Sequence, residues 1–126
     1  METTRIQFES WVTEAVDALP EKFRQHINNL AFFVEDYPSP MQLQKVKLLG
    51  QHDVMLLGLY EGYHQAMRLN VGPVFPDRIT LFKKPIERIC RTEEELKKQI
   101  ASTVRHEIAH HFGSDEAGAQ KAGKIK

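Results

Sequence analysis

The chain has 126 residues, with seventeen basic and seventeen acidic side chains and a single cysteine. This length predicts one domain, residues 1–126, built around one hydrophobic core. The zero net charge provides no field to concentrate nucleic acid or anionic membrane, so we expect neither as a partner. The N-terminus lacks a secretory pattern, no apolar run reaches eighteen residues, and Cys90 is alone, which predicts a cytoplasmic protein with a buried thiol.

The first third of the chain predicts two helices and a strand. Residues 8–19 place apolar side chains at i, i+3 and i+4 spacing, which is typical of an amphipathic helix. Pro20 suits the first position of a shorter helix over residues 20–29. Residues 30–36 are short, apolar and aromatic and precede YPSP, so we expect a buried strand and a turn. Residues 37–52 fit either a short helix or an irregular segment.

The middle of the chain predicts two more strands. Residues 54–63, VMLLGLYEGY, read as a strand that bends at its two glycines, and a loop follows. Residues 78–85 form a strand that Pro85 stops, and Pro85 can open a short helix over residues 85–90. From the order of the elements, we expect the strand RITLF to offer its edge to an extended peptide.

The last helix has the clearest signals. Thr92 followed by Glu95 is a capping box, which predicts that the helix begins there. Gly113 is placed to end it. Between them, apolar residues recur at i+4 steps and predict one buried face: Leu96, Ile100, Val104 and Ile108.

This helix carries the motif H-E-x-x-H. His106 and His110 are four residues apart, so they lie on one face of the helix, with Glu107 between them in angle. The pair falls at the boundary between the buried and the exposed face. Two neutral imidazoles can hold Zn²⁺, and the neighbouring carboxylate can take a proton from the bound water. The motif therefore predicts a zinc site with Glu107 as general base.

A catalytic zinc site needs a third protein ligand. Gly113 lets the chain turn back, and two carboxylates follow it. Glu116 is six residues after His110, and we favour it as the third ligand; Asp115, one residue earlier, is the alternative. His111 points about 100° around the helix from His110, toward the apolar face, and is better interpreted as a hydrogen-bonded core histidine.

The sequence resembles the small bacterial zincin-like proteins, often called minimal zincins, which are described as zinc metallopeptidases. The resemblance covers nearly the whole chain, and its most specific segments are PDRITLFKKPIERIC and VRHEIAHHFG. It implies an α+β fold in which a small mixed β-sheet is packed by helices and a C-terminal active-site helix lies beneath the edge of the sheet.

The same resemblance implies the roles of the motif residues. His106 and His110 would be ligands of one Zn²⁺ per chain, and Glu107 would be the general base. The third ligand in that family is typically an aspartate. In this chain GSDEAG is one residue shorter, so Asp115 comes one place early and Glu116 occupies the spacing.

Three functions are compatible with these features. A zinc-dependent metallopeptidase acting on a peptide or protein substrate is the leading hypothesis, with Tyr60, Tyr63, His64 and Arg68 as candidates for stabilising the oxyanion. The first alternative is a non-catalytic module in which a metal pins the C-terminus. The second is a metal-dependent endoribonuclease, because a bacterial rRNA-maturation family has a similar histidine spacing; the absence of net positive charge argues against it.

Overall fold

The computed structural model describes residues 1–25, 27, 29–48, 55–62 and 76–113. Their helices and strands are, in order, α1 (Arg5–Asp17), α2 (Glu21–Arg24), β1 (Leu30–Glu35), α3 (Pro40–Leu48), β2 (Gly58–Glu61), β3 (Asp77–Phe82), α5 (Lys83–Ile89) and α6 (Glu93–Gly113). The strand order is β1-β3-β2, with β1 parallel and β2 antiparallel to β3. The predicted α+β fold with a small mixed sheet is confirmed.

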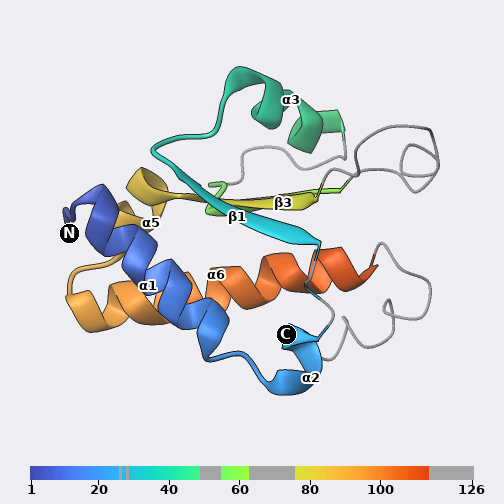
Figure 1. Ribbon diagram of the computed structural model, residues 1–126. Helices are drawn as coiled ribbons and strands as arrows, with labels where there is room; N and C mark the ends of the chain where they lie inside the picture. Colours follow the sequence, from blue (N-terminus) through green and yellow to red (C-terminus); the bar gives the residue numbers. More distant parts are fainter. Residues whose placement is uncertain (26, 28, 49–54, 63–75, 114–126) are drawn as a thin grey trace.

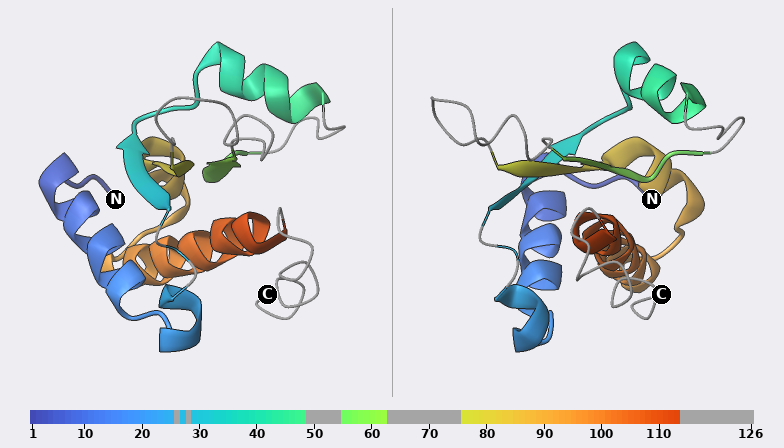
Figure 2. Two further views of the ribbon diagram at one scale, coloured as in Figure 1. Left: turned by 45° about the vertical axis from the view of Figure 1, so that its right-hand side comes forward. Right: turned by 90° about the vertical axis from the view of Figure 1, so that its right-hand side faces the viewer.

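The sheet lies between two layers of helix. Helices α1 and α6 lie on one face and α3 lies on the other (Figure 1), and two further directions show the same arrangement (Figure 2). The core forms where β3 meets α6. It includes Ile79 and Leu81 from the strand and the four predicted apolar residues of the helix, each at most 1% exposed: Leu96, Ile100, Val104 and Ile108. Burial of each such side chain stabilises the fold by roughly 1.5–3 kcal/mol.

Strand β3 is the central strand. It pairs with β1 on one side and with β2 on the other, so both of its edges are used within the protein. The expectation that RITLF offers its edge to a substrate is therefore wrong. The strand also ends at Phe82 rather than at Pro85, and α5 begins at Lys83. Pro85 lies in the first turn of α5, where the missing N–H has no intrahelical acceptor to lose.

Two capping boxes explain where α1 and α3 begin. Thr4 accepts a hydrogen bond from the backbone N–H of Gln7 and donates its own backbone N–H to the Gln7 side chain, both at 3.1 Å, so α1 begins at Arg5 rather than at residue 8. Ser39 and Gln42 make the same reciprocal pair, at 2.8 and 3.1 Å. This pair explains why the segment that follows YPS is a helix, α3.

The other two elements are shorter than expected. The predicted helix over residues 20–29 is the single turn α2, and Pro20 is its N-cap rather than its first residue. The strand predicted over residues 54–63 is β2, only four residues long; residues 54 and 63 lie outside the described part of the chain. None of the described helices is both long enough and apolar enough to span a membrane.

A buried glutamate of α5 pairs with a lysine of the same helix and also binds the N-terminal segment. The Nζ atom of Lys83 lies 3.0 Å from Glu87 Oε2, and both side chains are at most 5% exposed. The backbone N–H and the hydroxyl of Thr3 donate to the same oxygen, at 2.6 and 2.7 Å. Burial alone would raise the pKa of Glu87, but the bonds from Thr3 and Lys83 outweigh it and hold that pKa below 4.5.

Candidate metal centre

Helix α6 carries the candidate metal centre, and its first turn is capped. At the start, the backbone N–H of Glu95 donates to Thr92 Oγ1 at 3.1 Å, which confirms the predicted cap. Three glutamates in the first turn suit the positive end of the helix dipole. Along its length the helix packs against α1, β2 and β3. The motif lies in the last two turns, beneath β2.

The side chains of the motif converge. The Nε2 atoms of His106 and His110 are 3.3 Å apart, and the two rings meet edge to face with centroids 4.9 Å apart. With a carboxylate oxygen of Glu107, their ligand atoms all lie within 4.8 Å of one another. Both histidines are exposed, whereas Glu107 is 7% exposed. The predicted position at the boundary between core and solvent is confirmed.

The spacing of the two histidines suits a tetrahedral metal ion. Zinc–imidazole bonds of about 2.0–2.1 Å at a tetrahedral angle place the two nitrogen atoms about 3.3–3.4 Å apart. In the structure the two Nε2 atoms are 3.3 Å apart. Because imidazole is also a preferred ligand type for zinc, the donor set present fits this ion.

Glu107 is held in a protein environment rather than in water. Burial raises the pKa of its carboxyl group to about 7, and the backbone N–H of Tyr60, which bonds to the carboxylate, lowers it in part. The strand approaches closely because residue 58 is glycine. A Cβ atom there would lie 2.7 Å from Thr103 Cγ2 and 3.2 Å from Glu107 Cγ. Gly58 therefore allows β2 to lie directly against the motif.

The remaining candidates from the sequence divide into two groups. Tyr60 lies in the described part of the chain, and its hydroxyl donates to Asp77 Oδ2 at 2.6 Å. In this arrangement the hydroxyl hydrogen bonds to the protein and does not point to a substrate oxyanion. The others lie outside the described residues: the two carboxylates predicted as third ligand, Asp115 and Glu116, and the oxyanion candidates Tyr63, His64 and Arg68.

Asp77 is the residue that the sequence analysis missed. The sequence pattern places it at the end of a loop, but it is the first residue of β3 and only 1% exposed. His111 Nδ1 lies 2.9 Å from the same Oδ2 atom that accepts the Tyr60 hydroxyl. His111 thus faces the sheet, away from the pair His106 and His110. The only local sequence signal for this role is that Asp77 directly precedes an apolar strand. Many exposed turns have an acidic residue at the same place, so this signal does not indicate a buried aspartate.

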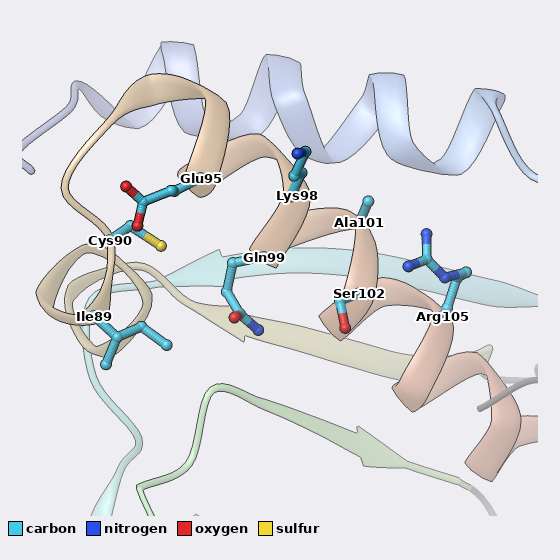
Figure 3. A pocket seen from close by; sticks show the side chains of 8 residues that line it. All are labelled: Ile89, Cys90, Glu95, Lys98, Gln99, Ala101, Ser102 and Arg105. Atoms are coloured by element: carbon cyan, nitrogen blue, oxygen red, sulfur yellow. The ribbon is translucent and has the colours of Figure 1, made fainter.

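A separate pocket opens on the outer side of α6. It has a volume of about 550 Å³ and lies where the connection from α5 meets the helix. Figure 3 shows Ile89 at the end of α5 and Cys90 directly after it, with Lys98, Ser102 and Arg105 along α6. Neither motif histidine lines this pocket. It is therefore distinct from the candidate metal centre.

The mixed sheet, the helix packed beneath it and the convergent H-E-x-x-H side chains define a zincin-like domain. The family model for zincin-like metallopeptidases matches residues 27–123, and the chain belongs to that family. A metal, typically zinc, is implied by this membership. No curated protein matches the chain.

The fold also occurs in a solved structure. A conserved hypothetical protein from Thermus thermophilus has a TM-score of 0.55 and 23% sequence identity, over 88% of this chain and 95% of that chain. At this level of identity the similarity establishes the fold, while the chemistry has to be argued from the residues of the site.

Proposed function

We propose that this protein is a zinc-dependent peptidase in which His106 and His110 bind the metal and Glu107 is the general base. The observation that carries the proposal is the pair of Nε2 atoms 3.3 Å apart beside a buried carboxylate. Membership of a metallopeptidase family supports the same class of reaction. One zinc ion bound there would polarise a peptide carbonyl and make a water molecule more acidic.

Glu107 is the residue that moves the proton. Its carboxylate takes a proton from the attacking water as the oxygen bonds to the peptide carbon. It then gives that proton to the amide nitrogen as the C–N bond breaks. A pKa of about 7 suits both steps, because the group exchanges protons readily near neutral pH. The backbone N–H of Tyr60 holds the carboxylate from the side of β2.

The substrate is a peptide or protein segment in extended conformation. Among the described strands β2 is an edge strand, and Gly58 brings it against Glu107. We therefore expect the substrate backbone to run beside β2, in place of the RITLF strand that the sequence suggested. Recognition through the main chain accepts many sequences, provided that the segment is unfolded.

Glu116 is the proposed third ligand, and Asp115 is the alternative. A catalytic zinc ion needs three protein ligands and one open position. Glu116→Ala should therefore lower the zinc content of the purified protein, whereas Asp115→Ala should leave it unchanged. The reverse pattern would assign the ligand to Asp115.

The reaction is tested with Glu107→Gln and a matched control. The control is Glu94→Gln, which replaces a glutamate of the same helix whose side chain is 79% exposed and paired with Lys98. Cleavage of an unstructured peptide library is followed by mass spectrometry. Glu107→Gln should keep its zinc and lose about 10²–10⁴-fold in rate, while Glu94→Gln cleaves as the wild type does. Cleavage that survives Glu107→Gln would overturn the proposal.

A further inference from the structure

Asp77 joins three separate elements at one buried oxygen atom. Its Oδ2 atom accepts the hydroxyl of Tyr60 from β2 at 2.6 Å and lies 2.9 Å from Nδ1 of His111 in the last turn of α6. The rings of Tyr60 and His111 also pack edge to face, with centroids 5.7 Å apart. A carboxylate that is 1% exposed is costly unless it is hydrogen-bonded, so the fold favours the arrangement in which both partners stay in place.

Both partners of Asp77 lie next to residues of the metal centre. Tyr60 bonds to the Glu107 carboxylate through its backbone N–H. His111 directly follows His110, and on a helix this offset fixes the two side chains about 100° apart. A hydrogen bond that fixes the His111 side chain therefore also fixes the direction of the His110 side chain. A hydrogen bond that fixes Tyr60 fixes the position of β2, the strand whose backbone N–H binds Glu107.

The last turn of a helix is less stable than its middle unless other contacts hold it. The final four carbonyl groups have no intrahelical partner, so helix ends fray. His110 lies only three residues before Gly113, where α6 ends. If that turn were free to fray, metal binding would have to order it, and the cost would appear as weaker affinity.

We propose that Asp77 is a positioning residue for the metal centre, which it preorganises by holding Tyr60 and His111. The inference rests on the proposed metal site at His106 and His110. Asp77 does not touch the metal or the substrate in this account. It acts through the His111 side chain on the last turn of α6 and through Tyr60 on β2.

The test is the metal affinity of Asp77→Asn, measured by competition between the protein and a chelating dye for zinc. Partners that orient metal ligands typically contribute 10–100-fold to affinity, so we expect a loss of that size. The absorption bands of bound cobalt should also shift, because the ligands are held less uniformly. A purely structural role for Asp77 would lower the melting temperature without either change when binding is measured well below that temperature.

Glu61→Gln is the matched control. Glu61 is the neighbour of Tyr60 on β2, but its carboxylate bonds to Lys45 and Gln42 of α3, on the opposite face of the sheet. It should therefore bind zinc as the wild type does. Tyr60→Phe removes the hydroxyl that binds Asp77 and keeps the backbone N–H that binds Glu107. It is the second test variant if Asp77→Asn folds poorly. We expect it to weaken zinc binding by about twofold to tenfold.

The outcomes separate this inference from the proposed function. If the wild type binds zinc and both Asp77→Asn and Tyr60→Phe bind it equally well, the positioning role is refuted and the metal site stands. Loss of affinity in Glu61→Gln to the same extent would also refute it, because the effect would then belong to β2 in general. If the wild type binds no zinc, the proposed function fails and this inference fails with it.

Discussion

Replacement of Gly58 by alanine tests how closely β2 must approach the metal centre. The added Cβ atom would lie 2.7 Å from Thr103 Cγ2, which is closer than such carbon atoms can approach without a shift of the surrounding atoms. Thr103 cannot easily turn away, because its hydroxyl donates to the Gln99 carbonyl at 2.8 Å and accepts from the Gln99 side chain at 3.1 Å. Strand β2 and helix α6 must therefore move apart.

The expected cost follows from two opposing effects. Overpacking of a filled interior costs about 1–3 kcal/mol. Replacement of glycine by alanine also restricts the unfolded chain, which offsets about 0.4–1 kcal/mol. We therefore expect Gly58→Ala to lower the free energy of unfolding by about 1 kcal/mol, and by no more than about 2.6 kcal/mol. The rate of peptide cleavage should fall as well, because the new methyl group also meets Cγ of Glu107, the proposed general base, at 3.2 Å.

A double-mutant cycle identifies the contact responsible. Thr103→Ser removes the Cγ2 atom and keeps the hydroxyl, so Gly58→Ala should cost about 1 kcal/mol less in the Thr103→Ser background than in the wild type. The free energies of unfolding are measured by urea denaturation of all four proteins. Additive effects of the two substitutions, without coupling between them, would refute the close approach of β2 to α6.

Two further predictions concern α5 and the residue that follows it. Glu87 has its pKa held below 4.5, so the stability it contributes is present above about pH 4.5 and is lost as the pH falls through its lower folded value. Glu87→Gln should therefore cost on the order of 3 kcal/mol at neutral pH, since Lys83 stays buried. The melting temperatures of the variant and the wild type should converge as the pH falls through the lowered folded pKa of Glu87, and a difference that stays constant with pH would contradict this. Cys90 is 5% exposed, and burial with the charge of Glu95 raises the pKa of its thiol, so a disulfide reagent should label it in urea but only slowly in the folded protein.

Helix α6 and its motif were predictable because the relevant signals lie within one element. The cap at Thr92, the apolar repeat and the pair His106 and His110 all depend on spacings of three or four residues, which the helix itself fixes. The burial of Glu107 between the two histidines follows from the same geometry together with the close strand β2.

The sheet order and the Asp77 cluster were not predictable in this way. Parallel pairing joins Leu30–Glu35 to Asp77–Phe82, and no pattern within either strand records its partner. Asp77 meets Tyr60 and His111 across 17 and 34 positions of sequence. A single sequence shows each of these side chains separately, and only the folded chain brings them to one oxygen atom.

The central claim is that the motif of α6 binds zinc. The most direct test is the zinc content of protein purified without chelator or added metal, for the wild type and for His110→Ala. Wild-type protein should carry about one zinc ion per chain, and His110→Ala should lose most of it. Wild-type protein without zinc, or equal zinc in both proteins, would contradict the claim.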